Sequence, residues 1–166
     1  MEKTEEIKFK AIGLIKTPYI DTAPYQPIAE DKGDFRIVLN YAYANGLLQL
    51  DKFSYMYVIY YIDQLSSKTE MIVHPPWSEE EVGLFASRSP MRPNPLGISI
   101  VKIKNIEGNE IITSGLDVFN NTPVLDIKPY IKDLDSKEDA NYGWIQEGQK
   151  DKEHLLLHIQ GIPHDY

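Results

Sequence analysis

The 166-residue chain contains no cysteine, and this absence excludes several kinds of site. A disulfide framework, a thiolate zinc site and a cysteine nucleophile all require the missing thiol. No apolar run approaches the roughly 20 residues that span a bilayer. The first six residues, Met-Glu-Lys-Thr-Glu-Glu, lack the apolar core of a secretory signal. We therefore expect a cytoplasmic protein without a membrane segment.

The common nucleotide and metal motifs are also missing. No Gly-x-Gly-x-x-Gly follows a strand-like run and no Walker loop occurs, which argues against a Rossmann or P-loop site. His154 and His158 are four residues apart, but the glutamate of a zincin does not lie between them. Surface histidines are the simpler interpretation, and we expect no bound metal.

Positive charge is scarce, since the net charge is −8. This balance argues against a general nucleic-acid coat, which would be basic. Residues 84–132 nevertheless carry six basic and four acidic side chains, a net +2, so the rest of the chain carries −10. A local basic face of this kind is compatible with binding an anion or RNA, and equally with chance.

Period-two alternation, by contrast, is abundant. The segment 35–43 alternates apolar and polar residues, and 53–62 is a long aromatic and β-branched run that predicts a central strand covered on both faces. Helical patterns are few: a single turn at 46–50 and a short helix at 136–145, capped by Ser136. The other strand candidates are 7–15, 70–73, 82–87, 98–104, 110–119 and 155–159, with Gly108-Asn109 as a hairpin turn.

Many short strands separated by turns predict a mostly β fold with few short helices. An antiparallel sheet of this kind closes into a barrel or packs as a sandwich. The length fits one domain with a core of its own, and no repeat or linker divides the chain. We therefore predict a single domain over residues 1–166.

A stiff loop at 87–97 carries two of the three arginines, Arg88 and Arg92. Its three prolines fix φ and push Arg92 and Asn94 toward extended conformations. A stiff loop presents the planar fork of arginine to a carboxylate or phosphate with little entropy left to lose. The alternative, a rigid connection whose arginines pair with protein carboxylates, has about equal weight.

A second polar segment follows the turn at 120–123. Asp126, Lys128 and Tyr130 alternate with apolar residues, so in an extended chain they lie on one face. An acid, an ammonium and a phenol together can hold a polar ligand or move a proton. The alternative is an Asp–Lys pair on a solvated strand.

The two segments, Arg88-Ser-Pro-Met-Arg-Pro-Asn-Pro-Leu-Gly97 and Thr122-Pro-Val-Leu-Asp-Ile-Lys-Pro-Tyr130, resemble the two conserved blocks of the TsaA-like, or TrmO, family. The resemblance runs from about residue 11 to 131. It implies a small, mostly antiparallel β-barrel, not a Rossmann fold, with its core at about 7–131 and 132–166 completing it. It also implies a homodimer that binds S-adenosylmethionine and methylates N6 of threonylcarbamoyl-adenosine beside the tRNA anticodon.

The resemblance also implies which positions contact the cofactor. Three of them differ from the family pattern: Tyr25 replaces an arginine, Asp63 replaces a histidine, and Asn120-Asn121 replaces Asp-Gly. An aspartate can still accept from a ribose hydroxyl, and a tyrosine can stack on adenine. The implied cofactor positions are Pro24, Tyr25, Gln26, Asp63, Gln64, Arg88, Leu96, Asn120, Asn121, Thr122 and Pro123.

Within this resemblance, we expect Asp126 to act as the base, with Lys128 and Tyr130 orienting it. The threonyl carboxylate of the substrate needs a cation, which Arg92 or Lys128 provides, with Asn94 beside it. Two alternatives stay open. One is a barrel that binds the cofactor without catalysis, and the other is a methyltransferase for a small molecule.

Overall fold

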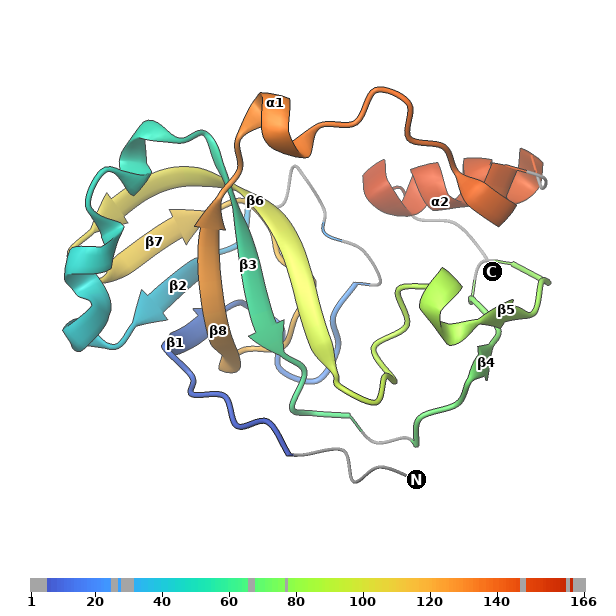
Figure 1. Cartoon of the computed structure of the whole chain (residues 1–166), viewed down its shortest axis with the longest axis horizontal. Coiled ribbons are helices and arrows are strands. Elements are labelled where there is room, and N and C mark those ends of the chain that lie inside the picture. Colours follow the sequence, from blue (N-terminus) through green and yellow to red (C-terminus); the bar gives the residue numbers. More distant parts are fainter. Residues whose placement is uncertain are drawn as a thin grey trace.

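Six of the alternating segments form strands that pair into a ring. The computed structural model describes residues 6–24, 27, 32–65, 68–76, 78–146, 149–160 and 162. The strands form a closed antiparallel barrel in the order β1-β2-β7-β6-β3-β8, on the left of Figure 1. The predicted antiparallel barrel is confirmed. Its strands are β1 (Gly13–Lys16), β2 (Arg36–Leu39), β3 (Tyr55–Tyr61), β6 (Leu96–Glu107), β7 (Glu110–Thr113) and β8 (Thr122–Pro129).

Strand β1 closes the ring, because it pairs with β2 on one side and β8 on the other. Ile15 lies opposite Ile37 of β2 and opposite Thr122 of β8. The segment 132–166, expected to complete the barrel, therefore adds no strand to it in the described residues. The single-domain organisation stays a prediction.

The inward positions of the strands fill the barrel with apolar side chains. Burying one such side chain stabilises the fold by about 1.5–3 kcal/mol, so the filled interior holds the ring together. The interior is thus a packed core and leaves the barrel ends and outer faces to bind ligands. The buried barrel residues include Ile15, Ile37, Leu39, Met56, Val58, Tyr60, Val101, Ile111 and Val124.

The remaining elements are short. Strands β4 (Ile72–Val73) and β5 (Val82–Gly83) form a separate two-stranded sheet. Figure 1 shows this sheet and α2 (Gln149–Gln160) together on the right, to the side of the barrel. No helix in the described part of the chain is both long and apolar enough to cross a membrane. The other helical elements are η1 (Tyr41–Leu47), η2 (Leu50–Lys52), η3 (Leu84–Ala86), α1 (Lys132–Asp135) and η4 (Gly143–Gln146).

Some predicted elements are wrong. The segment 155–159 is helical, within α2, because a short apolar run flanked by good helix formers fits either state. The helix predicted at 136–145 is absent apart from the 3-10 turn η4. The strand predicted at 35–43 ends at Leu39, because the side chain of Asn40 accepts from the Ala42 N–H and caps η1.

Other strands are present but shorter or longer than predicted. The structure trims 7–15 to β1, 70–73 to β4, 82–87 to β5 and 110–119 to β7, and it extends 98–104 into β6. The hairpin at Gly108-Asn109 is confirmed, with the positive φ of 61° at Gly108 that such a tight turn favours.

Candidate functional site

The two conserved blocks meet at one end of the barrel. Strand β3 ends where β6 begins, so Tyr61 lies opposite Leu96, and the Ile62 N–H donates to the Pro95 carbonyl at 2.8 Å. Strand β8 begins at the same end, next to the end of β1. We call this region the motif end of the barrel. It comprises Tyr61–Gln64, Leu96–Gly97 and Asn120–Pro123.

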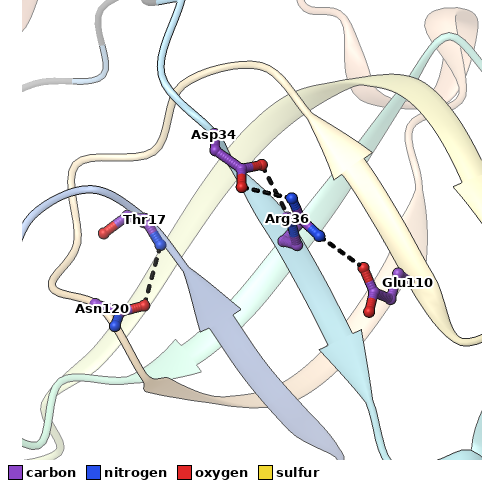
Figure 2. A network of polar contacts seen from close by, with 5 residues as sticks. All are labelled: Thr17, Asp34, Arg36, Glu110 and Asn120. Carbon is purple, nitrogen blue, oxygen red and sulfur yellow. Dashed lines mark hydrogen bonds and ion pairs between the residues drawn. The ribbon is translucent and has the colours of Figure 1, made fainter.

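The turn at the start of β8 is held by the end of β1. Asn120 accepts a hydrogen bond from the Thr17 N–H at 3.3 Å, as Figure 2 shows. The Asn121 N–H donates to the Ile15 carbonyl at 2.8 Å, and its side chain accepts from Lys16. Asn121 has φ of 71°, a left-handed conformation that asparagine tolerates better than most residues. Asparagine therefore suits this turn, where the resemblance implies Asp-Gly.

Thr17 fixes the other side of this turn. Its buried hydroxyl donates to the Val118 carbonyl at 2.9 Å and accepts from the Tyr19 N–H at 3.2 Å. Thr122 closes the turn itself, because its hydroxyl donates to the Phe119 carbonyl at 2.8 Å. Hydrogen bonds on both sides thus hold the turn in this conformation.

The two arginines of the stiff loop lie in different environments. Arg92 Nη1 donates to the carbonyls of Ser87 at 3.0 Å and Leu84 at 3.2 Å, and its guanidinium lies 5.5 Å from the centre of the Phe85 ring. Arg88 is exposed, and no described residue accepts a hydrogen bond from its guanidinium. Arg92 therefore orders the loop, whereas Arg88 is available to a ligand.

Asp117, in the connection from β7 to β8, is a half-buried acid beside this end of the barrel. Its Oδ1 is buried and has no hydrogen-bond donor among the described residues. Burial raises the pKa of Asp117 to about 6, and the positive charge of Arg88 opposes part of that rise. Arg88 and Asp117 form no direct ion pair within the described residues.

Tyr60 lies in the same cluster, with its side chain inside the barrel. Its hydroxyl is 3.1 Å from the Ser99 hydroxyl, and burial with the nearby charge of Asp117 raises its pKa to about 12. The ring lies over Gly97, where an added Cβ would be 2.0 Å from Cε2 of Tyr60. The glycine at the end of the arginine block therefore makes room for this ring.

The residues predicted to be catalytic share the outer face of β8. Lys128 Nζ contacts the Asp126 carboxylate at 2.8 Å, and the Tyr130 ring packs on that of Tyr57, with centroids 5.6 Å apart. Asp126 lies opposite Ile59 of β3, just before a bulge in the pairing. At about 3.3 Å per residue, Asp126 is about 13 Å along β8 from Thr122, and Tyr130 about twice as far. The structure thus confirms the shared face and leaves the catalytic role a prediction.

The other predicted contacts are at the motif end or near it. Asp63 and Gln64 follow β3 directly and are exposed, and Leu96 is 38% exposed. Pro24 is half-buried in the described part of the connection from β1 to β2. Tyr25 and Gln26 lie outside the described residues.

Sequence reasoning missed Asp117 and Tyr60 as parts of this cluster. The available signal was the single acid inside the apolar run Leu116-Asp117-Val118-Phe119. A charge in such a run is a candidate buried acid, and buried acids with shifted pKa values gather at functional sites.

Two further features lie away from the motif end. A shallow polar hollow is located where β6 ends, and it touches neither conserved block. The described residues contain no group of three or more histidine or carboxylate side chains placed to hold a metal ion. The hollow is lined by Leu47, Leu48, Gln49, Asp51 and Ile103–Ile106.

The chain is similar to known proteins of one family. Residues 14–136 match the family described as tRNA-methyltransferase O N-terminal domain. The chain belongs to this family. The crystal structure of TrmO from Pseudomonas aeruginosa superposes with a TM-score of 0.70 and 26% identity, over 85% of this chain and 63% of that one.

Curated relatives of this TrmO-family chain carry two kinds of name. An S-adenosyl-L-methionine-binding protein of Archaeoglobus fulgidus is 36% identical over 76% of this chain and 91% of its own length. The tRNA (adenine(37)-N6)-methyltransferase of Escherichia coli is 32% identical over 84% of this chain. The matched region spans 64% of the E. coli enzyme, and only 38% of a further A. fulgidus relative.

Proposed function

We propose that this chain is an S-adenosylmethionine-dependent methyltransferase that modifies N6 of threonylcarbamoyl-adenosine at position 37 of tRNA. The observation that supports it most is the meeting of both conserved blocks at one end of the barrel. The relatives named as cofactor-binding proteins and as tRNA methyltransferases give the chemistry. A cytoplasmic location stays a prediction.

The residues of the motif end fit the cofactor. The cofactor carries hydrogen-bonding groups, a carboxylate and positive charge. Next to the motif end, the chain offers the cation Arg88, whose guanidinium has no acceptor among the described residues, and the acid Asp117, whose Oδ1 has no donor among them. When bound, the cofactor supplies an electrophilic methyl group on a sulfonium. The proposed contacts are Pro24, Tyr25, Gln26, Asp63, Gln64, Arg88, Leu96, Asn120, Asn121, Thr122 and Pro123.

Positioning is the main contribution that the chain makes to methyl transfer. The nucleophile, the methyl carbon and the sulfonium must be in line, and rigid elements achieve this with little entropic cost. The turn held by Thr17 and the loop ordered by Arg92 are rigid in this sense. The first holds Asn120 through the Thr17 N–H, and the second holds the backbone on either side of Arg88.

Asp126 is the proposed base for the N6 proton of the acceptor. Of Asp126, Lys128 and Tyr130, Asp126 lies nearest the motif end, and Lys128 contacts its carboxylate at 2.8 Å. Tyr130 supports this face through its contact with Tyr57. A positioned carboxylate that takes a proton in the transition state contributes about 10²–10⁴-fold to the rate.

The threonyl carboxylate of the acceptor requires a cation near Asp126. Lys128 and Arg92 are the two candidates. Lys128 is exposed on that face and contacts Asp126, whereas Nη1 of Arg92 is engaged by loop carbonyls. Asn94 is exposed in the same loop as Arg92 and is the proposed amide partner of the acceptor.

A homodimer is the proposed assembly, and the outer face of β3 and β6 supports it. Leu96, Ile98 and Ile100 are 38%, 59% and 52% exposed, and they lie opposite Tyr61, Ile59 and Tyr57. The sequence predicted that β3 would be covered on both faces, but Tyr55 and Tyr61 are 44% and 43% exposed. A second copy of the chain would cover this apolar face.

A cofactor-binding barrel without catalysis is the second candidate. It is favoured by the A. fulgidus relative that is 36% identical. The match covers 91% of that relative, which is named only for cofactor binding. A chain of that size therefore exists in the family without a methyltransferase name.

Nucleoside mass spectrometry separates the two candidates. Purified protein is incubated with S-adenosylmethionine and tRNA that carries threonylcarbamoyl-adenosine. We expect the mass of that nucleoside to increase by one methyl group. Cofactor binding without this increase would contradict the methyltransferase proposal and support the second candidate.

A further inference from the structure

Trp144, in the 3-10 turn η4, donates a hydrogen bond to the segment that leads into Arg88. Its indole Nε1 lies 2.9 Å from the carbonyl oxygen of Ala86, 58 residues earlier in the chain. Ala86 ends η3, and the exposed Arg88 follows two residues later. The family match ends at residue 136, so the donor lies beyond the matched domain. The C-terminal segment is thus joined directly to the start of the stiff loop.

Two consecutive peptide carbonyls before Arg88 are held by two different side chains. Trp144 donates to the carbonyl of Ala86, and Nη1 of Arg92 donates to that of Ser87 at 3.0 Å. The Arg92 donor belongs to the loop itself, whereas the Trp144 donor ties the loop to a distant part of the chain. Without Trp144, only the second of these carbonyls would keep a side-chain donor among the described residues.

The residues around Trp144 hold its backbone in place. The Asn141 side chain accepts from the Gly143 N–H at 3.2 Å, and Gly143 has a left-handed φ of 58°, which glycine adopts without strain. Lys152 Nζ of α2 lies 4.1 Å from the centre of the Tyr142 ring, a cation–π contact, and α2 packs against η4. A turn and a helix therefore present the indole N–H to η3 with little entropy left to lose.

We propose that Trp144 is a positioning residue for the candidate cofactor site, and that its indole N–H fixes the backbone of Arg88 before the cofactor binds. Because the role of Arg88 in cofactor binding is itself proposed, this inference rests on the proposed function. A loop that must be ordered during binding costs free energy, so a loop that is already ordered binds more tightly. Loss of the Trp144 donor should therefore raise the Kd of the cofactor without removing any contact with it.

Two substitutions separate the indole N–H from the bulk of the ring. Trp144→Phe keeps an aromatic ring and removes the donor. Trp144→His keeps a donor, because Nε2 of imidazole has the position in its five-membered ring that Nε1 has in the indole. All proteins are compared at about pH 6, where an exposed histidine is mostly protonated and both ring nitrogens donate. Tyr142→Phe is the matched control, since it removes a polar group from a ring that is 47% exposed, two residues away.

Hydrogen exchange without ligand and calorimetry with S-adenosylhomocysteine measure the two consequences. Exchange is followed at the loop amides that donate hydrogen bonds, those of Ser87, Ser89 and Arg92, with β3 as the internal reference. In Trp144→Phe we expect faster exchange in the loop and unchanged exchange in β3. We expect its Kd to rise about threefold to tenfold, as the loss of one hydrogen bond does.

The two other variants define what the N–H contributes. Trp144→His should lie closer to the wild type than Trp144→Phe in both measurements. Tyr142→Phe should match the wild type in both. Urea unfolding checks that each variant is folded.

Unchanged loop exchange and unchanged affinity in Trp144→Phe would overturn the inference. A change in only one of the two measurements would overturn it as well, because Trp144 would then not act on the site through the loop. Equal losses in the Phe and His variants would assign the effect to ring packing and contradict the role of the N–H.

The proposed function and this inference can fail separately. A wild-type chain that does not bind S-adenosylhomocysteine would contradict the proposed function, and the positioning role with it. A wild-type chain that binds, with Trp144→Phe binding equally well, would contradict only this inference.

Discussion

Gly97 lies directly beneath the ring of its cross-strand neighbour Tyr60, and a Cβ at this glycine would be 2.0 Å from the ring. The contact joins the last residue of the arginine block to β3, which ends at Tyr61. It therefore fixes where the stiff loop enters β6.

Gly97→Ala should destabilise the fold, because the new methyl group must displace a buried ring. Overpacking of this kind costs about 1–3 kcal/mol, and urea unfolding measures it. Gly46→Ala is the control, since nothing lies within 4 Å of a Cβ there and its φ is not left-handed. Equal unfolding free energies for the two variants would contradict the account of Gly97.

The elevated pKa of Asp117 predicts a pH-dependent stability. Its native value is about 6 against 3.8 for the free side chain, so the folded state binds the proton more tightly than the unfolded state. The ionised form therefore destabilises the fold, and this cost develops as pH rises from about 4 to above 6. Two pKa units correspond to roughly 2–3 kcal/mol.

Asp117→Asn should remove that cost at neutral pH. The unfolding free energy of the variant relative to wild type should increase between pH 4 and pH 7 and then level off. Urea unfolding at several pH values measures the difference. A difference independent of pH would show that Asp117 does not titrate in this range.

Ile98→Lys should prevent the proposed dimer. A charge at the centre of the outer face of β3 and β6 would be desolvated in a dimer, at a cost of several kcal/mol. Light scattering after size exclusion should give two chains for the wild type and one for the variant. Leu48→Lys, at a residue that is 82% exposed near the opposite end of β3, should remain dimeric. A monomeric wild type would contradict the proposed assembly.

Asp126→Asn should lower methyl transfer by about 10²-fold or more if the carboxylate is the base. The fold should lose less than about 1 kcal/mol, because the contact with Lys128 is a solvent-exposed ion pair. The Kd of S-adenosylhomocysteine should be unchanged. Normal turnover in this variant would contradict the catalytic role of Asp126. Asp126 and Lys128 would then be only a surface ion pair.

The sequence predicted the class of fold because alternation has a direct physical cause. Ile15, Ile37 and Met56 face the core from segments whose sequence patterns predicted strands. The ends of the strands were harder to predict from the sequence. At the end of β2, the side chain of Asn40 accepts a local hydrogen bond from the Ala42 N–H, and the alternation of apolar and polar residues carries no sign of this bond. The run 155–159 has no period that separates strand from helix.

The candidate site was predicted only in part, for a similar reason. The arginine block and the polar face of β8 are visible as patterns. The division between Arg88 and Arg92 depends on which carbonyls the folded loop offers, and Arg92 takes those of Leu84 and Ser87. The burial of Asp117 Oδ1 without a hydrogen-bond donor among the described residues depends on packing between elements that are distant in sequence.

The account depends most on cofactor binding at the motif end, and a calorimetric titration with S-adenosylhomocysteine tests this directly. We predict one saturable site in the wild-type chain, an increase in melting temperature with ligand, and clear weakening in Arg88→Ala. No heat and no thermal stabilisation at millimolar ligand would contradict the account.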